Sequence, residues 1–205
     1  MTPDYWTQAT QELAGRDRVM KGLVQRFDDI ALKSRGDAFS TLVRSIVGQQ
    51  ISVKAAESVW QKVLKAIPDI TPHTIHDAED NVLRACGLSL RKISYLQDLS
   101  RHFREGLLNV STWESVDDEA LIAQLVRIKG IGRWTAEMFL IFHMLRPDVL
   151  PLDDIGLQRA ISQHYFDSRS VDRKVMRELA KRWQPWRSVA TWYLWRSLDP
   201  LPVEY

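Results

Sequence analysis

Apolar residues recur every three to four positions along most of the chain, which is the spacing of one face of an α-helix. The clearest stripe lies in residues 38–47 and consists of Phe39, Leu42, Val43, Ile46 and Val47. No stretch shows the strict apolar–polar alternation of a half-buried strand. The pattern therefore predicts an all-α fold of about nine or ten short helices.

Two interruptions of the helical pattern contain residues of chemical interest. The segment GQQI (residues 48–51) separates two helices, and Ser52 is placed to cap the second of them. Exposed glutamines in such a break are usually solvated loop residues. The segment KGIGR (residues 129–133) places two glycines around one apolar residue between two further helical patterns.

Glycine permits the positive φ that a tight turn needs and lets the backbone approach a ligand closely. The free N–H groups at the start of the helix after KGIGR form an anion site that suits a phosphate. Lys129 and Arg133 beside the turn favour that interpretation. From these residues alone, an ordinary helix–helix turn remains the alternative.

The composition is that of a globular protein, with 45% hydrophobic and 26% charged residues among 205. We find no run of about 18 apolar residues that would span a membrane. The N-terminus, MTPDYWTQATQEL, lacks the cationic head and apolar stretch of a secretory signal. The single cysteine, Cys86, excludes an internal disulfide and a cysteine-ligated iron–sulfur cluster. We therefore expect a cytoplasmic protein with no membrane partner.

The net charge of +2 does not by itself indicate a nucleic-acid partner, so a polyanion would need a local basic patch. Eight tryptophans are the unusual feature, and Trp183, Trp186, Trp192 and Trp195 lie close together near the C-terminus. Core packing is the commoner use of tryptophan. An aromatic wall for a flat, electron-poor ligand is the alternative that the sequence leaves open.

Four segments together resemble one protein family. They are SIVGQQIS (residues 45–52), LVRIKGIGRWTA (125–136), PLDD (151–154) and WQPWRS (183–188). In this order they resemble the HhH-GPD superfamily of DNA glycosylases, and within it the alkylbase (AlkA-type) branch. The chain resembles the short, all-helical form that lacks an N-terminal β-domain. It differs from the usual pattern at Lys129, where the hairpin normally carries a proline.

The resemblance implies an all-α fold of two helical lobes around a DNA-binding cleft. One lobe, residues 38–149, would carry the wedge and the hairpin. The other would be discontinuous, residues 1–37 plus 150–205, with the catalytic acid at the boundary. The implied activity is hydrolysis of the N-glycosidic bond of alkylated purines, such as 3-methyladenine or 7-methylguanine, in duplex DNA. The implied enzyme acts as a monomer in the nucleoid and repairs alkylation damage by base excision.

The resemblance also implies roles for single residues. Asp154 matches the essential acid, with Asp153 as runner-up, although an aspartate before a helix is most often an N-cap. The base pocket would use Trp134, Met138 and Trp195, and an alkylated, cationic purine would stack on such rings. Trp134 stands where base-excising enzymes that also cut the backbone carry a lysine nucleophile. The enzyme should therefore form no Schiff base.

For DNA contacts, the resemblance implies a wedge among Gln49, Gln50 and Ile51, with Gln50 preferred. It implies phosphate binding by the hairpin residues Lys129, Gly130, Ile131, Gly132, Arg133 and Thr135. The backbone carbonyls of Val126, Ile128 and Ile131 would hold a structural Na⁺ or K⁺, and no other cofactor is expected. Two alternatives remain: a glycosylase for deaminated or oxidised bases, and a non-catalytic DNA-binding module.

Overall fold

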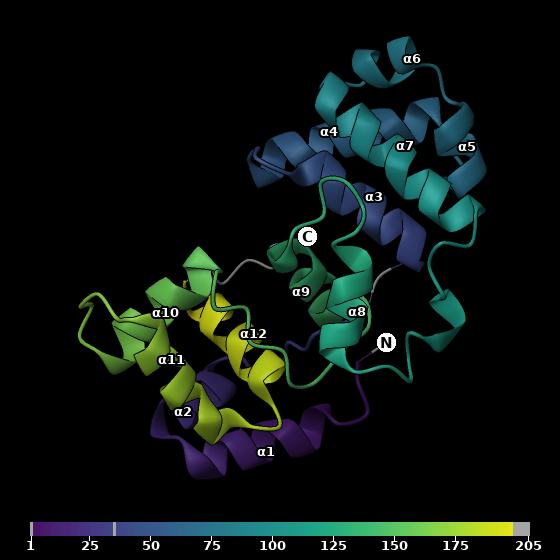
Figure 1. Ribbon diagram of the computed structural model, residues 1–205. Coiled ribbons are helices and arrows are strands. Elements are labelled where there is room, and N and C mark those ends of the chain that lie inside the picture. The colour runs from purple at the N-terminus through teal and green to yellow at the C-terminus, as the bar shows by residue number, and fades with distance from the viewer. Residues whose placement is uncertain (1, 35, 199–205) are drawn as a thin grey trace. The chain divides into compact units, whose positions relative to one another are not determined.

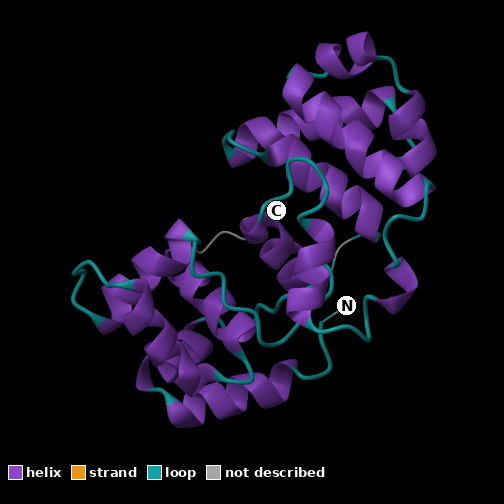
Figure 2. Ribbon diagram, viewed as in Figure 1, coloured by secondary structure: helices purple, strands orange, loops and turns teal. Residues whose placement is uncertain are grey.

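The computed structural model describes residues 2–34 and 36–198, and every regular element in these ranges is a helix (Figure 1, Figure 2). The predicted all-α fold is confirmed, with twelve α-helices in the described ranges rather than nine or ten. None of these helices is long and apolar enough to cross a membrane. In chain order the helices are α1 Trp6–Arg16, α2 Arg18–Arg26, α3 Ala38–Gly48, α4 Val53–Ala66, α5 Pro72–Asp77, α6 Asp80–Ala85, α7 Leu90–Arg104, η1 Val110–Thr112, α8 Asp118–Leu125, α9 Arg133–Phe142, α10 Ile155–Tyr165, α11 Arg173–Ala180, η2 Lys181–Trp183 and α12 Arg187–Leu198.

Helix α5 is one that the apolar spacing did not predict, because six residues are too few to show a period. Its start is nevertheless encoded in the sequence. Thr71 caps it, with Oγ1 accepting from the Thr74 backbone N–H at 3.2 Å, and Pro72 occupies the first turn. Thr74 Oγ1 accepts the Thr71 N–H at 3.0 Å in return. This is a capping box with threonine in the place that Glu or Gln usually takes.

The helices form two compact units. Unit 1 contains residues 2–34 and 140–198 of the described chain, and unit 2 contains residues 36–139. The boundary in the middle of the chain therefore lies at 139/140 rather than at the predicted 149/150. The reason is that residues from the end of α9 onward bond within unit 1: Phe142 stacks on Trp195 at 5.6 Å, and Ser34 Oγ donates to the His143 carbonyl at 3.0 Å.

The core of unit 1 is built from aromatic residues of α1, α12 and η2. Trp6 packs edge-on against Trp192 at 5.2 Å and lies roughly parallel to Tyr193 at 5.8 Å. The buried Trp183 donates its indole N–H to Asp17 at 3.2 Å, and Asp17 in turn caps α2. Core packing is thus the role of most of the C-terminal tryptophans, and Trp195 is the exception described below.

The core of unit 2 comprises α3, α4, α5 and α7, which pack against one another. The predicted apolar stripe of α3 is entirely buried. Phe39 of that stripe begins a chain of edge-on ring contacts that runs through Phe103 and Trp113 to Phe139 at the end of unit 2. This core carries the α3–α4 connection and the α8–α9 hairpin, the two interruptions noted in the sequence.

Candidate functional site

The hairpin between α8 and α9 is a type II turn. α8 ends at Leu125 and α9 begins at Arg133. The Ile131 N–H donates to the Ile128 carbonyl at 3.1 Å, and Gly130 has φ +82°. A hydrogen bond from position i+3 to position i, with glycine at a positive φ in the third position, defines this turn type. Lys129 therefore occupies the second position of the turn.

The two hairpin glycines meet different requirements. A Cβ atom at Gly130 would lie 2.1 Å from Cδ2 of Tyr95, so both the positive φ and a close approach require glycine there. A Cβ atom at Gly132 would meet nothing within 4 Å. The Gly132 carbonyl instead accepts the Ala136 N–H at 3.0 Å, which starts the hydrogen bonding of α9. The hairpin therefore depends sterically on the first glycine.

The α3–α4 connection lies against this hairpin. Gln49 donates from Nε2 to the Gly130 carbonyl at 2.8 Å, so one of the predicted wedge residues is bonded to the turn. Gln50 is exposed, has φ +58°, and accepts from Arg91 at 3.1 Å. A non-glycine residue in this left-handed region is uncommon, and such strain is concentrated at functional sites. Ser52 caps α4 as predicted.

A cavity of about 520 Å³ in unit 2 is lined by residues of the α3–α4 connection and of the hairpin. It is large enough for a flat aromatic ligand, since ligand pockets typically start near 300 Å³. The predicted site residues that line it are Gln49, Gln50, Ile51, Gly130, Trp134, Thr135 and Met138. The wedge candidates, the hairpin and two of the three predicted base-pocket residues thus share one cavity.

Other residues of the hairpin do not line this cavity. The Arg133 guanidinium is bonded to Glu119 through both terminal nitrogens and to Glu137 at 3.0 Å through Nε. The hydrogen bonds that Arg133 donates to the Glu119 carboxylate raise the pKa of Arg133 further above its ordinary value. Its charge is thus paired with carboxylates in this structure. Lys129 has an exposed side chain, and its phosphate contact, like that of Arg133, stays a prediction.

Asp154, the predicted acid, belongs to unit 1. It caps α10, with Oδ1 accepting the Leu157 N–H at 2.6 Å, as the simpler interpretation of an aspartate before a helix requires. Capping does not account for its whole environment, however. The residue is only 7% exposed, and the same oxygen accepts the indole N–H of Trp195 at 2.7 Å.

The adjacent acids Asp153 and Asp154 differ in the side chains that surround them. Trp195 is half-buried on α12 and stacks on Phe142 with a ring spacing of 5.6 Å. It therefore joins an aromatic face to the Asp154 carboxylate. Asp153 is exposed and forms an ion pair with Arg173 at 2.6 Å. Of the two acids, Asp154 is the one held in a buried aromatic environment.

Sequence reasoning missed three residues at the hairpin, all on α7. Tyr95 and Arg91 line the cavity, and Asp98 accepts the Lys129 N–H at 2.9 Å. The helix itself was predicted, but its contact with the hairpin joins residues 31 positions apart in the chain. No local signal identifies such a contact.

Two of the relatives that the chain matches are named DNA-3-methyladenine glycosylases. The chain is 32% identical over 199 residues to DNA-3-methyladenine glycosylase 1 of Schizosaccharomyces pombe, covering 93% of this chain and 87% of that protein. It is 33% identical over 169 residues to the putative DNA-3-methyladenine glycosylase YfjP of Bacillus subtilis, covering 78% of this chain and 59% of that protein. The chain thus spans less than two thirds of the bacterial relative.

A solved structure gives the same result in three dimensions. The S. pombe 3-methyladenine DNA glycosylase Mag1 in complex with abasic DNA matches with a TM-score of 0.80 and 30% identity, over 97% of this chain and 99% of that one. The model of the HhH-GPD superfamily base excision DNA repair proteins matches residues 43–185. These residues include both the hairpin and Asp154. The chain belongs to the HhH-GPD superfamily of base excision DNA repair proteins.

Proposed function

We propose that this protein is a monofunctional DNA glycosylase that releases alkylated purines of the 3-methyladenine and 7-methylguanine class from duplex DNA. The observation that carries the proposal is the buried Asp154 carboxylate with the Trp195 indole hydrogen-bonded to it at 2.7 Å. The names of the S. pombe and B. subtilis relatives support the substrate class.

The reaction requires the damaged nucleotide to leave the base stack, at a cost of about a few kcal/mol. Breaking the glycosidic bond then places positive charge on the sugar, and a nearby carboxylate stabilises that charge and orients the attacking water. We assign this role to Asp154. The hydrogen bonds from the Leu157 N–H and Trp195 fix the orientation of its carboxylate before substrate arrives.

An alkylated purine already carries a positive charge, so it is a good leaving group without an acid that protonates the base. Such a ring is attracted to aromatic faces by about 0.5–2 kcal/mol. Trp195, Trp134 and Met138 are the residues to which we assign base recognition. Trp134 lines the unit 2 cavity at the sequence position where a lysine nucleophile would stand in a bifunctional enzyme. An indole cannot form a Schiff base, so the expected product is an intact strand with an abasic site.

We assign the DNA contacts to the start of α9 and to the α3–α4 connection. The backbone N–H groups at the start of α9 suit a phosphate, and phosphate contacts position a protein without reading the sequence. Gln50, exposed and at φ +58°, is the wedge candidate we prefer over Gln49, whose amide is bonded to Gly130. A Na⁺ or K⁺ at the carbonyls of Val126, Ile128 and Ile131 stays a prediction. Of these carbonyls, that of Ile128 already accepts the Ile131 N–H at 3.1 Å in the turn, so a cation would share this oxygen with the turn hydrogen bond.

The decisive experiment measures which free base the protein releases. Duplexes with 3-methyladenine or 7-methylguanine are compared with duplexes that contain uracil or 8-oxoguanine. We expect release of the methylated purines and no adduct after borohydride treatment. Release of only uracil or 8-oxoguanine would show that the substrates are deaminated or oxidised bases. A trapped adduct would show that the enzyme is not monofunctional. DNA binding without release of any base would favour a non-catalytic binding module.

A further inference from the structure

The backbone N–H of Lys129 needs a hydrogen-bond acceptor that the hairpin turn does not supply. In a type II turn the hydrogen bond joins the first and fourth residues, here Ile128 and Ile131. The N–H of the second residue, Lys129, points away from that bond. Proline, which has no N–H and a fixed φ near −65°, is favoured at this second position for that reason. This chain has a lysine there, so its turn has one N–H more and is not fixed by a proline ring.

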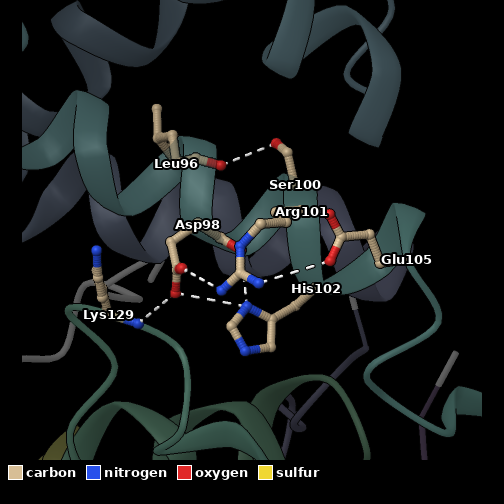
Figure 3. A network of polar contacts seen from close by, with 7 residues as sticks. All are labelled: Leu96, Asp98, Ser100, Arg101, His102, Glu105 and Lys129. Atoms are coloured by element: carbon tan, nitrogen blue, oxygen red, sulfur yellow. Dashed lines mark hydrogen bonds and ion pairs between the residues drawn. The ribbon is translucent and has the colours of Figure 1, made fainter.

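Asp98 of α7 supplies the acceptor (Figure 3). Its Oδ2 accepts the Lys129 N–H at 2.9 Å, while Oδ1 accepts from Arg101 at 2.8 Å. His102 Nδ1 lies 3.4 Å from Oδ2 and 2.8 Å from the Asp98 carbonyl oxygen. The residue is 7% exposed, so its carboxylate is a buried anion surrounded by donors from its own helix and one donor from the hairpin.

A buried carboxylate is retained at a cost unless its partners compensate for lost hydration. Here burial raises the pKa of Asp98, but the hydrogen bonds from Arg101 and the Lys129 N–H, together with His102, outweigh it and bring the pKa below its ordinary value. Arg101 and His102 are on the same helix and would be available to Asp98 in any hairpin conformation. The Lys129 N–H is the partner that depends on the conformation of the turn.

Two further contacts act on the next residue of the turn. The ring of Tyr95, one helical turn before Asp98, lies where a Gly130 side chain would stand, and Gln49 donates to the Gly130 carbonyl. The turn is therefore held at Lys129 by a charged acceptor and at Gly130 by steric contact and an amide. Asp98 is thus a charged group of α7 that fixes a backbone N–H of the hairpin.

We propose that Asp98 is a positioning residue for DNA binding: its carboxylate holds the hairpin in the phosphate-binding conformation that a proline at position 129 would otherwise favour. This inference rests on the proposed function, because it assumes that the hairpin binds a DNA phosphate. We assign Asp98, which is buried, no direct contact with DNA. It acts through the Lys129 N–H, so its loss should affect binding and leave the chemistry on bound DNA unchanged.

The first test compares Asp98→Asn with Glu105→Gln. Both replace a carboxylate of α7 by an amide, and both carboxylates pair with Arg101, but the hydrogen bonds of Glu105 do not extend to the hairpin. We expect Asp98→Asn to weaken binding to an abasic-site duplex about tenfold, because the amide is neutral and has one acceptor oxygen for two donors, the Lys129 N–H and Arg101. Base release at saturating DNA stays unchanged. The slope of log K against log[salt] should stay near that of the wild type, because it counts lysine and arginine contacts with phosphates and the affected contact is made by backbone N–H groups. Glu105→Gln should change none of these.

A general loss of fold stability in Asp98→Asn would lower the active fraction without changing the affinity of the folded fraction. The second test therefore removes the donor instead of the acceptor. Lys129→Pro is compared with Lys129→Met, which loses the same charge but keeps the N–H, in the wild-type and Asp98→Ala backgrounds. With Asp98 present, proline leaves the carboxylate one donor short and places its ring against Oδ2, so Lys129→Pro should bind DNA about tenfold more weakly than Lys129→Met. In the Asp98→Ala background the order should reverse or the difference vanish, because proline then suits the turn.

The role of Asp98 would be overturned if the ratio of the Lys129→Pro affinity to the Lys129→Met affinity were the same in both backgrounds. An unchanged affinity in Asp98→Asn would overturn it as well. Failure of the proposed function gives a different result. In that case the wild-type protein releases no methylated purine, while the affinities of the variants can still be compared. A wild-type protein that shows no salt-dependent affinity for duplex DNA would instead remove the phosphate contact that the role of Asp98 assumes.

Discussion

The acid site of unit 1 and the hairpin of unit 2 present different chemical groups, side chains at the first and backbone groups at the second. At Asp154 the functional groups are side chains, a carboxylate and an indole joined by a 2.7 Å hydrogen bond. At the hairpin they are backbone groups, and the side chains of Gln49, Tyr95 and Asp98 hold the turn from behind. Substitutions at the first site should therefore change the rate on bound DNA, whereas substitutions at the second should change affinity.

The largest effect is expected for Asp154→Asn. The amide oxygen can still accept from the Leu157 N–H and from Trp195, so the helix cap and the fold persist. The charge that stabilises the cationic sugar is lost, and base release should fall by about 10²–10⁴-fold in single-turnover assays. DNA affinity should stay near that of the wild type. Asp153→Asn is the matched control, because its ion pair with Arg173 is exposed and worth little. Wild-type turnover in Asp154→Asn would show that the acid is misassigned.

Trp195→Phe tests whether the indole N–H matters to the acid. Phenylalanine keeps a ring to stack on Phe142 but removes the hydrogen bond to Asp154. A hydrogen bond to a charged group is worth about 1.5–3 kcal/mol, so we expect about a 10- to 100-fold loss in the rate of base release. Trp186→Phe removes a comparable bond, from its indole to Glu12 at 2.9 Å, away from the acid. It should lower thermal stability without lowering the rate, and equal rate losses in both variants would contradict the role of the indole.

Gly130→Ala tests whether the shape of the hairpin turn determines DNA affinity, and Gly132→Ala is its control. The first places a methyl group at φ +82° and 2.1 Å from the Tyr95 ring, so the turn must shift. We expect about 1–3 kcal/mol of lost stability and about tenfold weaker binding to all duplexes, damaged or not. The second meets open space and should bind nearly as well as the wild type. Calorimetry and fluorescence anisotropy give the two quantities. A loss confined to one lesion in Gly130→Ala would argue against a phosphate contact.

The same contrast explains how much the sequence could predict. Local patterns predicted the buried stripe of α3, the cap of α4 and the start of the helix after Asp154, because each depends on neighbours within one or two turns. They could not predict that Asp98 bonds to Lys129, that Tyr95 excludes a side chain at Gly130, or that Arg133 pairs with Glu119. These contacts depend on how distant helices pack. The unit boundary at 139/140 was missed for the same reason, since no composition change marks it within α9.

The smallest effect, and the most specific test of the acid site, is expected for Gly156→Ala in the first turn of α10. A methyl group there would lie 3.1 Å from Asp154 Oδ1 and 3.2 Å from Trp195 Cδ1, close enough to displace both by a few tenths of an ångström. We expect about a threefold slower base release, corresponding to about 0.7 kcal/mol at the transition state. Alanine also favours the helix over glycine by about 0.5–1 kcal/mol, so stability should not fall in parallel.

Gly22→Ala in α2 is the control for that gain, since its Cβ would meet nothing within 4 Å. It should raise the melting temperature and leave the rate unchanged. A rate loss in Gly156→Ala without a stability loss would then be a consequence of geometry at the carboxylate alone. If Gly156→Ala instead releases bases as fast as Gly22→Ala, the position of the Asp154 oxygen is not critical to within those tenths of an ångström. The acid would then act through its charge, a role that tolerates displacement, and the hydrogen bond from Trp195 would serve to bury the carboxylate rather than to aim it.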